Sequence, residues 1–580
     1  MVKEQRKFKK MKTFSDIKEN LDFAYKFFKN KNFDKAEKLY KKILKKFPNN
    51  FDANYFMASI KAQKNNFYDA KDYMEAAISI KPNLPELNNN LGMVYLNLNE
   101  LEKSIDYFKK AISLNKGYVI AYTNLGMAYV SLKKVPEAKE SYNKAIEIDP
   151  DNLLANFNLA NLLKRLSDHK NSEIFYKKAI EINPNYLPAY NNIMDLYDKS
   201  NQNDKLSDLI NTAEKIFNND QVIKSFKAKL LYKNNKYKEV VNLLEKVEFL
   251  PEQIVQKQAS YEVLAKSYDK LGDYNNAFKL FQMLNNIMDQ SKDPAVDKKI
   301  YVNSTKDRLN FFNNSKISNW GLPKVLDDNN DPYFLIGFPR SGTTLLDTIL
   351  RSHPSIEVLE EIPIINRFID ELFINKDFTL DNLENTDPAL IKEMRDYYFN
   401  QIKSYKKNKE KKITIDKMPL NILHVGEIHR FFPNAKFILA LRHPYDCVLS
   451  CFMQNFMLNH AMANFLNLED ASKLYDLTMS LWKKYIKVFK INHHIIRYED
   501  VISNFEKTIE GVLSFLNVPW SDSVTEFYKT AEKRGIINTP SYNQVSQPIY
   551  SNSMYRWKNY EKEFVKSNIS LENWIKEFNY

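Results

Sequence analysis

The sequence predicts a multidomain protein, an all-α repeat solenoid followed by an α/β domain with a central parallel sheet. Small residues and prolines recur every 34 residues in the N-terminal half, and strand-like apolar runs alternate with helical segments after residue 331. Glycine is scarce, at 10 of 580 residues, which favours long helices over hairpin-rich sheets. We expect a solenoid at 17–291, a capping helix and linker at 292–331, and the second domain at 332–580.

The repeat period is the difference between the residue numbers of equivalent positions. Three series of residues spaced by 34, or by twice that number where one place is skipped, are Ala24, Ala58, Gly92, Gly126 and Ala160; Ala36, Ala70, Ser104, Ala138 and Ser172; and Pro48, Pro82, Pro150 and Pro184. This pattern resembles the tetratricopeptide repeat, in which small residues stand where two antiparallel helices cross and proline ends the second helix. Degenerate continuations bring the array to about eight units.

Tetratricopeptide arrays form right-handed solenoids with a concave face, and the resemblance implies binding of a peptide or partner protein there. A rigid spacer or a dimerisation surface is the alternative. Asparagines on the first helices of the units are either amides that bind a peptide backbone or ordinary surface residues; they are Asn88, Asn124, Asn158 and Asn192.

A glycine-bracketed loop opens the second domain. The apolar run 333–336 precedes Gly337–Thr344, and apolar residues at helical spacing follow, so the segment reads as strand, loop and helix. Backbone N–H groups at such a helix start bind anions. The loop approaches the nucleotide-binding pattern G-x-x-x-x-G-K-[ST], but Thr343 replaces the lysine, which argues against a kinase or ATPase. Arg340 restores one fixed cation.

The run Pro339–Thr344, followed by Ser352-His353-Pro354 and Glu360-Glu361, resembles the 5′-phosphosulfate loop of sulfotransferases, most of all the protein-tyrosine branch. The resemblance covers roughly 332–560. It implies 3′-phosphoadenosine 5′-phosphosulfate (PAPS) as donor and no metal. The implied donor-binding residues are Arg340, Ser341, Gly342, Thr343 and Thr344 in the loop, Arg442 and Ser450 at the 3′-phosphate, Tyr498 near the adenine, and Arg556 in a closing loop.

The resemblance also implies three catalytic residues. Lys417 ends a predicted strand and would stabilise charge on the leaving oxygen. Glu361, 21 residues after Arg340, is the general base, and Ser541 assists Lys417. A carboxylate with a pKa of about 4.3 is a weak base for a phenol of about 10, so the proton must leave as the S–O bond forms, and we expect burial beside Glu360 to raise the basicity of the base.

Two histidines rival Glu361 as base, but we expect structural roles for both. His353 precedes a proline in a helix-ending turn, and His424 lies on a predicted helix behind the Lys417 turn. One departure from the protein-tyrosine branch weakens the 3′-phosphate assignment, because Gln454 replaces an arginine.

Charge, cysteine content and hydropathy narrow the remaining classes of function and location. The net charge of +13 comes largely from lysines, which we interpret as solvated helix faces rather than a nucleic-acid surface. The two cysteines, Cys447 and Cys451, favour a reducing compartment and make a zinc site improbable. No apolar run reaches the ~18 residues of a membrane span, so we expect no membrane association and a cytoplasmic location.

These observations together predict a PAPS-dependent sulfotransferase. Its acceptor would be a hydroxyl group, with protein tyrosine as the leading candidate and sugar, lipid or small-molecule hydroxyls open, and the solenoid would recruit the acceptor or a partner. One rival is a tetratricopeptide scaffold whose nucleotide-binding domain is catalytically silent. A second rival is a kinase that uses the same loop.

Overall fold

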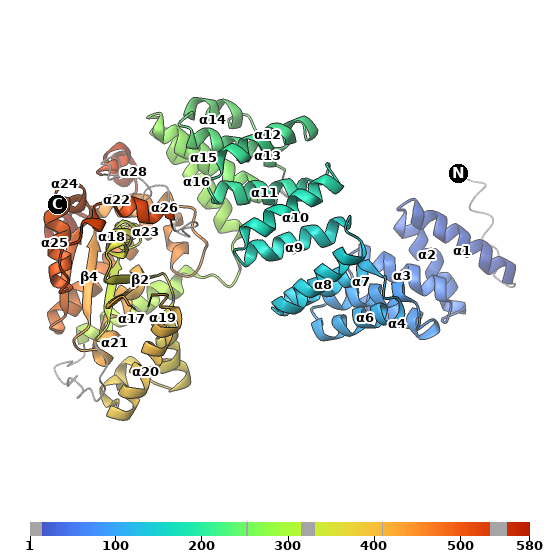
Figure 1. Ribbon diagram of the computed structural model, residues 1–580, viewed down its shortest axis with the longest axis horizontal. Coiled ribbons are helices and arrows are strands. Elements are labelled where there is room, and N and C mark those ends of the chain that lie inside the picture. Colours follow the sequence, from blue (N-terminus) through green and yellow to red (C-terminus); the bar gives the residue numbers. More distant parts are fainter. Residues whose placement is uncertain (1–13, 251–252, 315–330, 409, 534–553) are drawn as a thin grey trace. The chain divides into compact units, whose positions relative to one another are not determined.

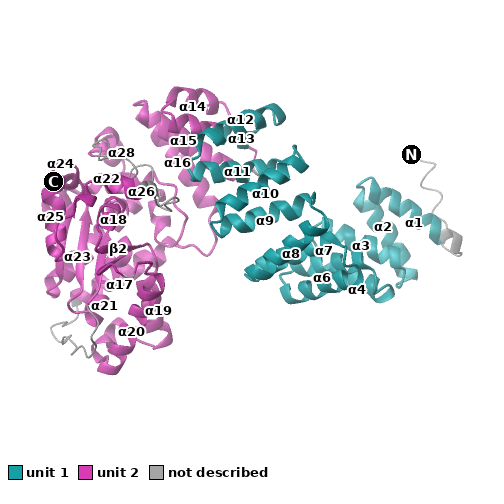
Figure 2. Ribbon diagram, viewed as in Figure 1, with its two compact units in different colours: residues 1–226 teal, residues 227–580 magenta. Residues whose placement is uncertain are grey.

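The computed structural model describes residues 14–250, 253–314, 331–408, 410–533 and 554–580 (Figure 1). The chain divides into two compact units, residues 1–226 and 227–580 (Figure 2). The division falls within one helix, α13 (Gln221–Lys233). We describe each unit separately.

The first unit is built of antiparallel helix pairs, in which each odd-numbered helix packs against the even-numbered helix that follows it. Neighbouring pairs also pack on each other, so the prediction of an all-α solenoid is confirmed. The helices are α1 (Phe14–Lys29), α2 (Phe33–Lys46), α3 (Phe51–Gln63), α4 (Phe67–Ile80), α5 (Pro85–Asn97), α6 (Leu101–Leu114), α7 (Val119–Ser131), α8 (Val135–Ile148), α9 (Leu153–Arg165), α10 (His169–Ile182), α11 (Leu187–Lys199) and α12 (Asn203–Ile216).

The turn inside each pair contains one residue in the left-handed conformation. These turn residues have φ between 55° and 61° and are again spaced by 34: Lys31, Asn65, Asn99, Lys133, Ser167 and Asn201. Asparagine tolerates this conformation best, whereas lysine and serine adopt it at some cost. The sequence analysis missed this series because its members share no chemical property.

The small residues of the repeat pattern stand where the two helices of a pair cross. A Cβ atom on Gly92 would lie 2.7 Å from the ring of Phe108, and a Cβ on Gly126 would lie 2.5 Å from the ring of Tyr142. Both rings are buried. The close approach therefore requires the absent side chain.

Gly126→Ala should destabilise the first unit by about 1–3 kcal/mol, because overpacking against the buried Tyr142 ring exceeds the helix-propensity gain of alanine. The urea midpoint followed by circular dichroism measures this. Gly117→Ala is the matched control, since its Cβ would meet Asn115 Oδ1 at an ordinary 3.5 Å. Equal midpoints for the two variants would contradict the packing argument.

The second unit contains a five-stranded parallel sheet with strand order β2-β3-β1-β4-β5. The predicted α/β class with a central parallel sheet is thereby confirmed. The strands are β1 (Tyr333–Gly337), β2 (Ile356–Glu360), β3 (Ile413–Lys417), β4 (Lys436–Leu441) and β5 (Asn492–Arg497).

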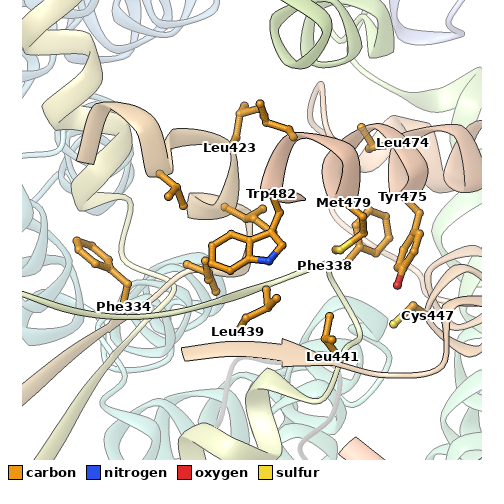
Figure 3. Close-up of a cluster of buried hydrophobic side chains, with 14 of the residues drawn as sticks. Phe334, Phe338, Leu423, Leu439, Leu441, Cys447, Leu474, Tyr475, Met479 and Trp482 are labelled. Carbon is orange, nitrogen blue, oxygen red and sulfur yellow. The ribbon is translucent and has the colours of Figure 1, made fainter. Parts of the chain in front are cut away.

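Helices cover both faces of this sheet. On one face, α18, α25 and α26 pack over Leu335, Ile415 and Ile438. On the other face, α23 brings the fully buried Trp482 against strand residues such as Phe334 and Leu439 (Figure 3). Alternate residues of each strand thus enter different cores, as the pleat requires.

The helical elements of this unit range from single short turns to α23, which has 21 residues. They are α14 (Tyr237–Leu244), α15 (Ile254–Lys270), α16 (Tyr274–Ser291), α17 (Lys298–Asn314), α18 (Thr343–Ser352), α19 (Ile364–Asp370), η3 (Glu371–Asn375), η4 (Leu380–Asn385), α20 (Pro388–Tyr405), η5 (Pro419–His424), α21 (Val425–Phe431), α22 (Pro444–Phe452), η6 (Met462–Leu466), α23 (Leu468–Val488), α24 (Tyr498–Ser503), α25 (Phe505–Phe515), η7 (Asp522–Val524), α26 (Phe527–Lys533), η8 (Arg556–Tyr560), α28 (Glu561–Lys566) and α29 (Glu572–Glu577).

Helices α16 and α17, which precede the sheet in sequence, pack directly on the α/β core. Asn285 of α16 donates a hydrogen bond to the carbonyl of Phe452 at 2.9 Å. Arg308 of α17 donates from Nε to the buried Glu427 at 2.9 Å. The compact unit therefore begins at residue 227, whereas the sequence places a domain boundary between 291 and 332. Specific polar pairs and shared core residues join the two segments, and no periodicity reveals such contacts.

Asp416 is a buried acid in the centre of the sheet. It is 1% exposed and accepts a hydrogen bond from Tyr398 at 3.4 Å. Burial raises its pKa from 3.8 to about 7. The folded protein therefore keeps Asp416 protonated where the unfolded chain ionises it.

A raised acid pKa gives stability that is present below pH 4 and lost as the pH rises to about 7. Asp416→Asn removes this loss, so its stability relative to the wild type should rise between pH 5 and pH 8, by at most about 4 kcal/mol. Thermal melts at both pH values measure the difference. Asp381→Asn, at an exposed position, is the control. Parallel pH profiles for Asp416→Asn and the wild type would refute the prediction.

Candidate functional site

The carboxyl ends of all five strands carry predicted site residues in one row. The register pairs Glu360 of β2 with Lys417 of β3, and Lys417 with Leu335 of β1. It then pairs Gly337 with Ala440 of β4. Arg442 follows β4 and Tyr498 follows β5, and these strands pair at their last residues. Ligands of open parallel sheets bind beyond this edge.

The glycine loop is shaped by contacts that exclude side chains. A Cβ on Gly337 would lie 2.6 Å from the carbonyl of Ala440, and a Cβ on Gly342 would lie 2.9 Å from the ring of Tyr498. Gly342 has φ +94° and begins α18, while Arg340 has φ +69°. A non-glycine residue in this conformation is strained, which is common at functional sites.

Several donors gather at this loop. The hydroxyl of Ser341 is buried and has no hydrogen-bond partner among the described residues. Thr343 and Thr344 are buried in the first turn of α18, where the helix dipole favours an anion. The unpaired hydroxyl and the bare helix start fit a phosphate or sulfate group.

Three arginines concentrate positive charge beside the loop. Arg340 Nε donates to Ser450 Oγ at 3.0 Å, and Arg442 Nη1 donates to the carbonyl of Arg340 at 3.3 Å. Burial lowers the pKa of Arg340, and the charges of Arg442 and Arg556 lower it further. The direct contact places Arg442 beside Arg340, and an anion bound there would offset the repulsion between their charges.

The structure thus brings Arg340 and Ser450 into one hydrogen bond, although the resemblance assigns them to opposite ends of the donor. Arg442 also lies over the ring of Tyr498, with 5.0 Å between the guanidinium carbon and the ring centroid. Tyr498 in turn packs on Gly342. The glycine loop and the residues that directly follow β4 and β5 therefore form one continuous cluster.

Lys417 and Glu361 form a second cluster at the other end of the row. Lys417 is fully buried, and its Nζ lies 2.6 Å from Glu361 Oε1 and 3.9 Å from Glu360 Oε1. The N–H of Glu361 donates to the Lys417 carbonyl, and Glu361 has φ +51°. The Glu361 side chain is 45% exposed, so the expected burial is wrong within the described residues. The cause is its position after the strand, where the left-handed backbone is held by Lys417.

Two buried acids brace the β4 tip. Glu499 accepts a hydrogen bond from the N–H of His443 at 3.0 Å, and Asp446 accepts one from the N–H of Trp557 at 2.8 Å. Burial raises the pKa of both carboxyl groups. The sequence analysis passed over them. The signal that could have found Asp446 is an acid one turn before Ser450, at the start of the same helix.

Three further residues from the sequence analysis, Arg556, His353 and His424, lie among the described residues. Arg556 pairs with Asp269 of α15. His353 is buried and its Nε2 lies 3.0 Å from the carbonyl of Pro519. His424 is buried against Glu427 and Arg308, and burial lowers its pKa. Both histidines are therefore held by structural contacts.

Ser541 lies outside the described residues. Within them, no group of three His, Cys, Asp or Glu side chains could hold a metal ion. No helix in the described part of the chain is long and apolar enough to cross a membrane.

The first unit has its own hollow, of about 460 Å³, lined by α5, α7 and α9 and including Asn158, Asn161 and Arg165. Two of the predicted asparagines pair across neighbouring repeats: Asn124 donates to Asn89 at 2.9 Å and Asn192 donates to Asn161 at 2.8 Å.

Asn88 instead is buried and donates to the carbonyls of Pro82 and Leu84. A role for it as a surface amide is therefore wrong. Its side chain satisfies the turn before its own helix, a task the sequence does not distinguish from ligand binding.

Comparison with known proteins finds two families in different parts of the chain. The sequence pattern of the sulfotransferase family matches residues 332–522. Patterns of the tetratricopeptide repeat match residues 27–85, 85–118, 119–152 and 154–186.

Relatives of the second unit include protein-tyrosine sulfotransferases. Protein-tyrosine sulfotransferase 1 of Danio rerio is 25% identical over 255 residues, 41% of this chain and 69% of that protein. Protein-tyrosine sulfotransferase 2 of Gallus gallus is 26% identical over 242 residues, 39% of this chain and 62% of that protein. An uncharacterized protein of Aquifex aeolicus is 27% identical over 309 residues, 52% of this chain, and the match spans only 39% of its own length.

Proposed function

Because the chain carries a sulfotransferase-family domain behind tetratricopeptide repeats, we propose that it is a PAPS-dependent sulfotransferase that acts on an acceptor hydroxyl, with protein tyrosine as the leading acceptor. The observation that carries the proposal is the row of strand ends. It joins the glycine loop, Lys417 and Arg442 at one edge of the sheet. The sequence similarity of 25–26% to protein-tyrosine sulfotransferases supports the acceptor.

The residues present fit the donor. The unpartnered Ser341 hydroxyl and the start of α18 offer neutral donors for one anionic group. Arg340 and Arg442 add charge-assisted donors, and burial together with the neighbouring charges lowers the pKa of Arg340. Thr343, where nucleoside triphosphate enzymes have lysine, disfavours a longer phosphate chain.

When bound, PAPS supplies the sulfuryl group and the leaving bisphosphate. Lys417 would hold its positive charge beside the leaving oxygen, and because it is fully buried the charge acts at low dielectric. Arg340 would neutralise the terminal oxygens. Both charges are in place before reaction, which removes the cost of ordering them.

Glu361 would accept the acceptor's proton. Its exposed carboxylate faces solvent on one side and Lys417 on the other, so an acceptor hydroxyl can approach it. The pair with Lys417 orients the carboxylate at the strand end. The proton transfer is then concerted with S–O bond formation, because a carboxylate cannot remove a phenolic proton beforehand.

We assign acceptor recruitment to the solenoid. The hollow lined by α5, α7 and α9 combines amides, apolar side chains and Arg165, a combination that suits a peptide segment carrying an acidic residue. A catalytically silent scaffold is the alternative function. The Lys417–Glu361 pair at the strand ends speaks against it, because a fully buried lysine is costly to keep without a role.

Calorimetry with 3′-phosphoadenosine 5′-phosphate (PAP) and with Mg·ATP tests donor use. We expect tight binding of PAP without Mg²⁺, since fixed cations and amides make the site, and weak binding of Mg·ATP, since the loop lacks the lysine. Preference for Mg·ATP would overturn the proposal in favour of a kinase. PAP binding without sulfate transfer to any acceptor would favour the silent scaffold.

Glu361→Gln should leave PAP affinity within a few-fold of the wild type and reduce turnover by about 10²–10⁴, because the amide cannot accept the proton. Transfer of labelled sulfate from PAPS to tyrosine peptides, with phenylalanine peptides as blanks, measures turnover. Glu360→Gln is the matched control and should cause a much smaller loss, as its carboxylate lies 3.9 Å from Lys417. Full turnover in Glu361→Gln would place the base elsewhere.

A further inference from the structure

Helix α15 precedes the region matched by the sulfotransferase family, yet it contacts the C-terminal segment of the same unit. Asp269, near its end, accepts hydrogen bonds from Arg556 Nε at 3.1 Å and from the Tyr560 hydroxyl at 2.6 Å. Arg556 Nη2 lies 2.9 Å from the same oxygen. The Asp269 side chain is 11% exposed and the Arg556 side chain 30%, so the pair is partly shielded from water.

Arg556 is also fixed through its backbone. The next residue, Trp557, donates its N–H to Asp446 at 2.8 Å, and the preceding Tyr555 has φ +52°. Asp446 lies in the first turn of α22, the helix that carries Ser450. Asp446 thus fixes the backbone next to Arg556, and Asp269 fixes the Arg556 side chain.

Arg556 adjoins the candidate site through its neighbour Trp557, which binds Asp446 and stacks on His443, the residue after Arg442, with 5.2 Å between the ring centroids. Its charge also contributes to the lowered pKa of Arg340, after the larger effect of burial. Neighbouring guanidinium groups repel one another, so each needs a contact that fixes its position. Ser450 provides that contact for Arg340, and Asp269 provides it for Arg556.

We infer that Asp269 is a positioning residue for donor binding, which it supports by fixing Arg556 beside the candidate site. The inference rests on the proposed function. Asp269 engages the edge of the guanidinium formed by Nε and Nη2, which sets the plane of the group, and Nη1 takes no part in this pair. A bound phosphate would meet an arginine already ordered, so less conformational entropy is lost on binding.

A purely neutralising role for Asp269 predicts the opposite change in donor affinity. A carboxylate near an anion site repels the anion, so if Asp269 merely neutralised Arg556 its removal would tighten donor binding. The sign of the change in PAP affinity therefore distinguishes positioning from neutralisation.

The test is a double-mutant cycle on the full chain, with PAP affinity measured by calorimetry. Asp269→Asn should weaken PAP binding about tenfold, since loss of a charged hydrogen bond costs of this order. Arg556→Ala should weaken it at least as much. The double variant should match Arg556→Ala within twofold, because Asp269 acts only through Arg556.

Two further variants separate positioning from stability. Arg556→Lys keeps the charge but loses the two-nitrogen contact, so it should weaken PAP binding with little change in melting temperature. Lys298→Ala breaks another ion pair between a helix preceding the sheet and α23, and should leave PAP affinity unchanged.

Unchanged or tighter PAP binding by Asp269→Asn would overturn the inference, as would additive losses in the double variant. Failure of the wild-type protein to bind PAP would instead refute the proposed function, and the inference with it.

Discussion

The second unit depends on a concentration of positive charge at the strand ends that the fold itself must hold in place. Burial lowers the pKa of Arg340, and the charges of Arg442 and Arg556 lower it further. Each is restrained by a different kind of contact: a hydroxyl, a backbone carbonyl or ring, and a carboxylate. Such preorganisation costs folding stability and lowers the reorganisation needed when a multiply anionic ligand binds.

The need to hold these charges in place explains why the compact unit extends beyond the region matched by the sulfotransferase family. Helices α15–α17 supply Asp269, Asn285 and Arg308, which contact η8, the end of α22 and α21, respectively. Arg308 and Glu427 form a buried pair behind the Lys417 turn. Removing one partner would leave an uncompensated buried charge, which is costly, so these helices are integral to the unit and not a detachable linker.

Local sequence patterns predicted most of the fold and the site residues that line the strand ends. Apolar runs and the glycine loop indicated β1 to β5, and carboxyl ends of parallel strands meet at one edge. Long-range pairs could not be predicted: Asp269 and Arg556 are 287 residues apart in sequence. The exposure of Glu361 was missed for the same reason, since it depends on a left-handed backbone held by Lys417.

The left-handed turn residues have a consequence for how the solenoid can vary. Each pair has the same turn geometry between its two helices and packs on its neighbours, so a whole module can be gained or lost while every remaining junction stays as it was. The solenoid can thus lengthen or shorten in steps of 34 residues without a change at the strand ends that carry the candidate site. The repeat array and the sulfotransferase-family region are free to evolve at different rates.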